Sequence, residues 1–212
     1  MKNHQRVSEG FALAASLHHE QTRKVGKTED PALAISYITH LAEVFALVIQ
    51  GFGDDDQMIA ALLHDAIEDV PETPDGRVTA EVIEEMFGAR VLELVLANTD
   101  ARPKPGEEKA DWEVRKVEHL AHLRELAEGD PSLLLVGLAD KLSNGQAIVN
   151  DLNLRGPIVW DRFNASKEQV LWYYGEMLKI FQEFIPDNPL VPRLESVVHQ
   201  MQVISEKVEP SR

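Results

Sequence analysis

Apolar side chains recur at intervals of three and four residues along most of this chain, and sustained alternation of apolar and polar residues is absent. The first pattern is typical of amphipathic helices, whereas half-buried strands would need the second. We therefore predict an all-α helical bundle. Because we find no repeat, low-complexity tract or flexible linker, residues 1–212 are expected to form a single domain. Helices are expected near residues 5–20, 35–50, 56–69, 79–87, 89–98, 111–128, 131–151, 158–184 and 190–207.

Turn and capping residues separate the predicted helices. Residues 51–53 (GFG) follow a helix end, and residues 54–56 (DDD) supply an N-cap and an acidic first turn. Asp130 before Pro131 is the pattern of an N-cap with proline at the first helical position. The helix after residue 187 either packs on the body or sits at an interface. Loops rich in proline and glycine are expected at residues 71–76 and 101–106.

Charge and composition exclude several classes of function. The chain has 36 acidic against 21 basic residues, a formal net charge of −15, and such a chain repels a phosphate backbone, so we expect no nucleic-acid partner. A small phosphorylated ligand is still compatible, because a pocket can be locally basic or hold a metal. The absence of cysteine excludes disulfides and thiolate metal sites, and it fits a cytoplasmic protein. No apolar run approaches the roughly 18 residues that a membrane span needs.

One predicted helix, residues 56–69, carries an unusual polar face. At about 100° per residue, Glu68 lies about 40° from His64, with Asp65 and Asp69 at about 100° and 140°. A solvated face is the ordinary interpretation of such a pattern. Solvated faces, however, usually mix cations with acids, whereas this face holds a histidine and three carboxylates and no cation. The adjacent His-Asp pair offers one nitrogen and one oxygen ligand, which suits Mn, Fe, Zn or Mg.

Two further residues are candidates for the same site. Asp140 ends the apolar run of residues 133–139, and a buried carboxylate must either pair with a cation such as arginine or bind a metal. Asn144 lies one turn later on the same helical face. His40 alone would be taken as a structural histidine, because a lone helical histidine is more often structural than a ligand.

Five segments together carry a resemblance to a known family: residues 37–40 (YITH), 60–69 (AALLHDAIED), 87–88 (FG), 95–100 (VLANTD) and 138–144 (LADKLSN). In this order they resemble the HD-domain metal-dependent phosphohydrolases, and more closely the hydrolase domain of RelA/SpoT-type proteins. That family hydrolyses the alarmone guanosine 3′,5′-bis(pyrophosphate). The resemblance runs from about residue 23 to residue 174. It implies a stand-alone small alarmone hydrolase with the HD-domain fold, since the chain leaves no room for synthetase or regulatory domains.

The resemblance also implies roles for individual residues. The expected ligands of one divalent metal, Mn²⁺ in this family, are His40, His64, Asp65 and Asp140. Glu68 and Asp69 match the acidic pair that handles the attacking water. The expected substrate-binding residues are Arg23, Lys24, Asn144 and Tyr174, with Tyr173 as the alternative to Tyr174.

The sequence departs from the family pattern at three places. Sixteen positions separate Lys24 from His40, several more than usual; Ser143 stands where the family usually has histidine; and Ser36 replaces a proline. The alternatives left open are an HD-type 5′-nucleotidase or nucleoside triphosphate hydrolase, and a metal-binding regulatory domain without turnover. The expected partner is a small phosphorylated nucleotide, with no membrane contact, and the sequence leaves self-association open.

Overall fold

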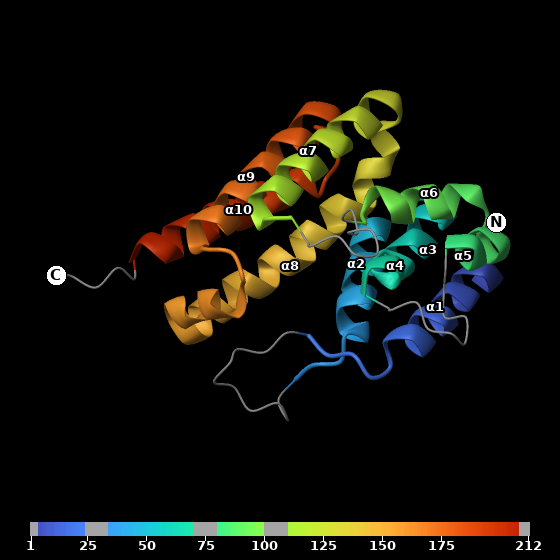
Figure 1. The fold of residues 1–212 in the computed structure, drawn as a ribbon, viewed down its shortest axis with the longest axis horizontal. Coiled ribbons are helices and arrows are strands. Elements are labelled where there is room, and N and C mark those ends of the chain that lie inside the picture. The colour runs from blue at the N-terminus through green and yellow to red at the C-terminus, as the bar shows by residue number, and fades with distance from the viewer. Residues whose placement is uncertain (1–3, 24–33, 70–79, 100–109, 208–212) are drawn as a thin grey trace.

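The computed structural model describes residues 4–23, 34–69, 80–99 and 110–207, and it confirms the all-α prediction. Within these ranges there is no strand, and the one extended feature is an isolated bridge between Thr22 and Ser36. Figure 1 shows helices α1 to α6 gathered at one end of the long helix α8, with α9 and α10 beside the rest of it, and α7 packs against α9. The helices are α1 (His4–His18), α2 (Ile38–Gln50), α3 (Asp55–Leu63), α4 (Ala66–Asp69), α5 (Ala80–Phe87), α6 (Ala89–Ala97), α7 (Trp112–Gly129), α8 (Leu134–Arg155), α9 (Lys167–Phe184) and α10 (Val191–Lys207).

Helix α8 is the central element of the bundle. Its 22 residues span about 33 Å at 1.5 Å per residue, and it packs against α2, α3 and α10. The apolar run at its start is buried on every side, as the sequence predicts for an interior helix. Asp130 and Pro131 introduce this run as expected: the Asp130 side chain accepts from the Ser132 amide, and a short 3₁₀ turn (Pro131–Leu133) leads into α8.

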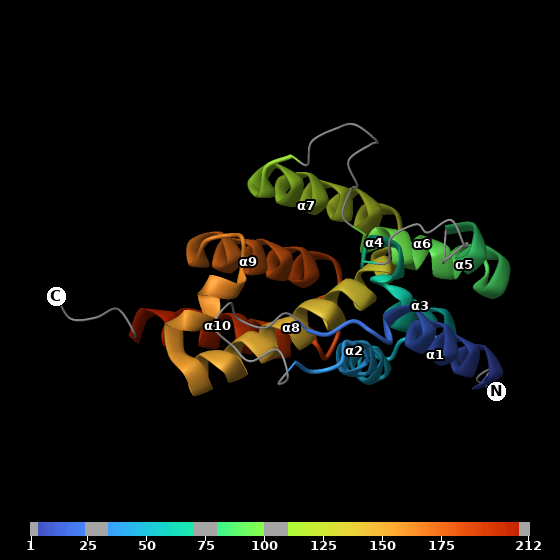
Figure 2. The same ribbon diagram turned by 60° about the horizontal axis from the view of Figure 1, so that its bottom comes forward.

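The corner between α2 and α3 forms as predicted. At Gly53 a Cβ atom would come within 2.4 Å of Val48 Cγ1, so only glycine lets the chain pass so close to α2. Asp54 then caps α3: its side chain accepts from the Gln57 amide, and the Gln57 side chain accepts from the Asp54 amide. The corner turns the chain so that α3 packs against α2, and the two helices lie next to each other in Figure 2.

Two predicted helices are each divided in the structure. The helix expected over residues 56–69 stops at Leu63 and resumes at Ala66 as α4. In a continuous helix the Ala61 carbonyl would accept from the Asp65 amide, and here Nδ1 of the His64 ring lies 2.8 Å from that carbonyl oxygen. The side chain thus competes for the helical acceptor at the point where the helix is interrupted.

The prediction of one continuous helix over residues 158–184 is also wrong. Residues Gly156–Arg162 form a 3₁₀ helix, and α9 starts only at Lys167. The cause is a second capping box, in which the Ser166 side chain accepts from the Gln169 amide while the Gln169 side chain accepts from the Ser166 amide. Such a cap begins a helix and so separates it from the preceding turn.

The C-terminal helix packs on the body of the protein, which decides between the two alternatives left by the sequence. Helix α10 lies along α8 and contacts α9. Gly145 on α8 permits this approach, because a Cβ atom there would lie 2.7 Å from Val197 Cγ1. None of the helices in the described ranges is long and apolar enough to cross a membrane.

Candidate metal centre and adjoining pocket

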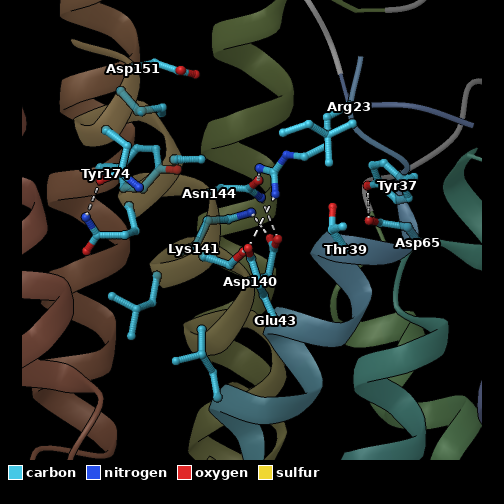
Figure 3. A pocket seen from close by; sticks show the side chains of 18 of the residues that line it. Arg23, Tyr37, Thr39, Glu43, Asp65, Asp140, Lys141, Asn144, Asp151 and Tyr174 are labelled. Carbon is cyan, nitrogen blue, oxygen red and sulfur yellow. Dashed lines mark hydrogen bonds and ion pairs between the residues drawn. The ribbon is translucent and has the colours of Figure 1, made fainter. Parts of the chain in front are cut away.

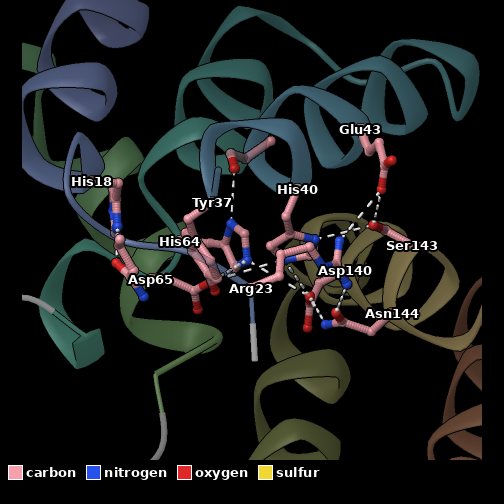
Figure 4. A network of polar contacts seen from close by, with 12 residues as sticks. His18, Arg23, Tyr37, His40, Glu43, His64, Asp65, Asp140, Ser143 and Asn144 are labelled. Atoms are coloured by element: carbon pink, nitrogen blue, oxygen red, sulfur yellow. Dashed lines mark hydrogen bonds and ion pairs between the residues drawn. The ribbon is translucent and has the colours of Figure 1, made fainter. Parts of the chain in front are cut away.

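The predicted metal ligands come together from three places in the fold (Figure 4). His40 lies on α2, His64 and Asp65 lie in the turn after α3, and Asp140 lies on α8. Nε2 of His40 is 3.2 Å from Oδ1 of Asp140, and Nε2 of His64 is 3.0 Å from Oδ2 of Asp65. His40, His64 and Asp65 offer ligand atoms that all lie within 4.8 Å of one another, so these three could hold a metal ion.

The His64 ring is arranged to offer Nε2 to a cation. The ring is only 2% exposed, and its Nδ1 faces the Ala61 carbonyl, which can only accept, so the proton belongs on Nδ1. Nε2 is buried, and no described residue forms a hydrogen bond with it. A buried nitrogen without such a partner, beside carboxylates, is the arrangement expected of a metal ligand.

The two aspartates supply negative charge to this buried site. Burial opposes the ionisation of Asp65, yet His64 and a hydrogen bond donated by the Tyr37 hydroxyl lower its pKa to about 2. Burial likewise opposes ionisation of Asp140, but Lys141 and the two histidines hold its pKa well below the usual value. Ionised carboxylates and imidazole nitrogens form a donor set that fits a divalent cation.

The same electrostatic coupling acts on the neighbouring bases. Burial alone would lower the pKa of His64, but the charges of Asp65 and Asp140 raise it well above the usual value. Burial would also lower the pKa of Lys141, and Asp140, whose Oδ2 lies 2.6 Å from Nζ, raises it. The site therefore favours positive charge among its carboxylates.

A large pocket adjoins these ligands (Figure 3). It has a volume of about 1110 Å³, and its wall includes Asp65, Asp140 and Glu68. Farther along, the wall includes Lys116 on α7 and the two tyrosines of α9, Tyr173 and Tyr174. Nζ of Lys116 lies 5.0 Å from the centre of the Tyr173 ring. The pocket thus leads from the acidic ligands to a wall with cationic and aromatic side chains.

The predicted substrate-binding residues are partly brought together. Arg23 donates to Asn144 Oδ1 at 3.0 Å, across 121 positions of sequence, and both line the pocket. Tyr174 also lines it and is buried, and burial raises its pKa, so the hydroxyl stays neutral. Tyr173 lines it too, so the alternative between the two tyrosines stays open. Lys24 lies outside the described residues.

The predicted acidic pair lies on α4. Glu68 is exposed and lines the pocket. The backbone of Asp69 belongs to α4, but its side chain lies outside the described part of the structure. Glu68 therefore faces the same pocket as Asp65 and Asp140, and its catalytic role stays a prediction.

Several pocket residues were not singled out from the sequence. Tyr37 stood in a motif without a role, yet its hydroxyl donates to the Asp65 carboxylate. His119, taken from the sequence as a surface or packing residue, lines the pocket. Ser143 was noted only as a departure, and Glu43 not at all, although both contact the network around His40. For Tyr37, the available signal was its position three residues before His40, which places both on one face of the chain.

Comparison with known proteins gives a consistent set of similarities. A family model described as an HD domain matches residues 11–168. The chain is 34% identical over 161 residues to guanosine-3′,5′-bis(diphosphate) 3′-pyrophosphohydrolase MESH1 of Mus musculus. The aligned region covers 75% of this chain and 76% of that protein. It is 28% identical over 142 residues to the bifunctional (p)ppGpp synthase/hydrolase SpoT of Escherichia coli K12, of which it covers 17%.

Two solved structures resemble the fold. One, described as a metazoan ortholog of SpoT that hydrolyzes ppGpp, has a TM-score of 0.65 and 25% identity, covering 92% of this chain and 94% of that one. The other, lmo0812 of Listeria monocytogenes, has a TM-score of 0.62 at 23% identity, a likeness of fold alone.

Proposed function

The chain belongs to the HD-domain family, and we propose that it removes pyrophosphate from the 3′ position of guanosine 3′,5′-bis(pyrophosphate), leaving GDP. The observation that carries the proposal is the cluster of His40, His64 and Asp65, with ligand atoms within 4.8 Å of one another, at one end of a pocket with cationic and aromatic walls. The similarity to named 3′-pyrophosphohydrolases over three quarters of the chain supports the choice of substrate.

The proposed ligands of one divalent metal are His40, His64, Asp65 and Asp140, and Mn²⁺ is the proposed ion. A dication there would polarise a phosphoryl group and acidify water. The donor set supports this assignment, because it combines buried imidazoles with ionised carboxylates. A cytoplasmic location and a single-domain chain stay predictions, and self-association stays open.

Glu68, with Asp69, is proposed to take a proton from the attacking water. The water oxygen then bonds to the phosphorus attached to the ribose 3′ oxygen, and the bond between that phosphorus and the 3′ oxygen breaks. The 3′ oxygen takes up a proton, and pyrophosphate leaves. The exposed position of Glu68 on the pocket wall supports its role as a base rather than as a ligand.

Arg23, Lys24, Asn144 and Tyr174 are proposed to bind the nucleotide. A chain of net charge −15 needs local cations to attract a ligand with two anionic arms. Arg23 and Lys141 line the pocket and supply such charge. An arginine can also stack on a guanine ring, which lysine does poorly.

A substrate panel tests the proposal. The purified protein is loaded with Mn²⁺ and offered ppGpp, 5′-monophosphates and 5′-triphosphates, with pyrophosphate and inorganic phosphate measured separately. We expect pyrophosphate from ppGpp alone. Inorganic phosphate from monophosphates, with ppGpp left intact, would instead indicate a 5′-nucleotidase, and cleavage of triphosphates alone would indicate a triphosphate hydrolase. Retention of Mn²⁺ without any cleavage would favour a regulatory domain.

A further inference from the structure

The two ring nitrogens of His40 face different partners (Figure 4). The ring is 1% exposed. Its Nε2 lies 3.2 Å from Oδ1 of Asp140, on the side of the proposed metal. Its Nδ1 lies 3.1 Å from Oγ of Ser143. Because a neutral imidazole carries one proton, the partner of Nδ1 decides whether the lone pair of Nε2 is available to a cation.

Ser143 has its own proton committed elsewhere. Its Oγ donates to Oε2 of Glu43 at 2.8 Å. A carboxylate can only accept, and a serine hydroxyl has a single hydrogen, so Oγ is left with lone pairs toward His40. Nδ1 of His40 must then be the donor in the contact with Ser143. The order of donation therefore runs from His40 through Ser143 to Glu43.

We propose that Ser143 and Glu43 are positioning residues, which keep the proton on Nδ1 of His40 and so present Nε2 to the metal. His64 reaches the same state by another route, because its Nδ1 faces the main-chain carbonyl of Ala61. The inference rests on the proposed metal site and not on the proposed substrate.

The placement of the pair on the helices supports this role. Glu43 follows His40 by three positions on α2, and Ser143 follows Asp140 by three positions on α8. Each helix that carries a proposed ligand thus carries one member of the pair on the same face one turn later. The contact between α2 and α8 holds the two members together. Loss of a group that hydrogen-bonds a metal-binding histidine typically lowers metal affinity by about 10- to 100-fold.

The first test measures the dissociation constant of Mn²⁺ from the full chain, by electron paramagnetic resonance of the free ion. Ser143→Ala removes the acceptor of the Nδ1 proton, and we expect affinity to fall by about 10- to 100-fold. Ser143→Thr keeps a hydroxyl and should restore most of the affinity. Ser205→Ala is the matched control, because Ser205 is a buried serine on α10 that donates to the Met201 carbonyl. It should bind Mn²⁺ as the wild type does.

The second test separates the effect of the hydrogen-bond chain on the His40 tautomer from an effect of packing. In Glu43→Leu the Ser143 hydroxyl is free to donate to Nδ1, which favours the wrong tautomer, so Mn²⁺ affinity should fall. Glu43→Gln retains an oxygen that can accept, and its affinity should stay nearer the wild-type value. In protein loaded with diamagnetic Zn²⁺ and labelled with ¹⁵N-histidine, Ser143→Ala should weaken the Nδ1 proton signal of His40 and leave that of His64.

The results of these tests separate failure of the positioning role from failure of the metal site or of the proposed substrate. Wild-type Mn²⁺ affinity in both Ser143→Ala and Glu43→Leu, with the Nδ1 signal of His40 retained, overturns the inference. If Ser143→Ala fails to fold by circular dichroism, the comparison of Glu43→Leu with Glu43→Gln decides, and equal affinity in these two overturns it. A wild-type protein that binds no Mn²⁺ removes the metal site and the inference together. Failure to cleave ppGpp overturns only the proposed substrate, because none of these measurements uses a nucleotide.

Discussion

The proposed metal ligands and the residues proposed to bind the nucleotide are held in place by different kinds of contact. At the metal end, His40 and His64 are almost fully buried, and each ring is oriented by a hydrogen bond from Nδ1 within the core. Arg23, by contrast, lies in an extended segment and is engaged by Glu43, whose Oε2 is 3.6 Å from Nη1, and by Asn144, which itself donates to Asp140. Lys116 lies over the Tyr173 ring.

This difference separates a preorganised site from an adaptable one. The metal ligands are fixed when the core folds, so a cation meets them without further ordering. Arg23 makes contacts with protein groups that a phosphate or a base would have to replace, and part of the binding free energy is used in that exchange. We expect substitution of a metal ligand to abolish function, and substitution of a nucleotide-binding residue such as Arg23 to weaken it.

The largest effect is expected at the ligand pair. His64→Ala or Asp65→Ala should abolish metal retention and bring activity to background, because each removes a proposed ligand. Elemental analysis after gel filtration measures the metal. Asp151→Ala is the control, since Asp151 lines the far part of the pocket beside Arg162 and should leave metal content unchanged. Full metal occupancy in the His64 and Asp65 variants would contradict the preorganised site.

A smaller effect is expected at the proposed base. Glu68→Gln keeps the shape of the side chain but cannot accept a proton, so kcat should fall by about 10²- to 10⁴-fold with Mn²⁺ still bound. Steady-state kinetics and elemental analysis check the two parts separately. Glu84→Gln, an exposed acid on α5, serves as the control. Loss of the metal from Glu68→Gln would make Glu68 a ligand and extend the metal end onto α4.

Substitution of Arg23, a residue proposed to bind the nucleotide, should change KM more than kcat. Arg23→Ala removes charged hydrogen bonds worth about 1.5–3 kcal/mol, so KM for ppGpp should rise by about 10- to 100-fold with kcat less affected. Arg90→Ala, which removes a guanidinium paired with Asp130 at 2.8 Å, is the control and should leave KM unchanged. An equal fall in kcat and in kcat/KM would instead mean that Arg23 acts mainly in the transition state and is not an adaptable binding residue.

The smallest effect concerns the helix that supplies the tyrosines. Ser166→Ala removes the cap of α9 and should lower the free energy of unfolding by about 1 kcal/mol, measured by urea denaturation. Mn²⁺ affinity should stay unchanged, because α9 supplies none of the proposed ligands. A fall in Mn²⁺ affinity would show that the two ends of the pocket are not independent.

Much of the fold could be predicted because helical periodicity and capping residues are local signals. Asp54 and Asp130 cap the segments expected of them. The interruption at His64 was not predictable in this way, because it involves a ring competing for a main-chain acceptor. Ser166 could have been recognised as an N-cap from Gln169 three residues later, and the apolar periodicity running through it obscured that signal.

The residues around the proposed metal and the candidates Arg23 and Asn144 could be named from the sequence, whereas the contacts among the latter could not, for a related reason. His64 and Asp65 are adjacent in sequence, and Asp140 ends a distinctive apolar run. The contact of Arg23 with Asn144 joins residues 121 positions apart and depends on how the helices pack. The contact of Ser143 with Glu43 spans 100 positions, so a departure at one residue gave no sign of its partner.

The hydrogen bond that orients His64 ends on the main chain, and this has a consequence for how the protein can change over generations. Every amino acid brings a carbonyl group, so substitution at residue 61 leaves the acceptor itself in place. The acceptor for His40 depends on the side chains encoded at two positions, 143 and 43. A mutation at either of two codons can therefore remove the hydrogen-bond chain that orients His40. No single codon plays that part for His64.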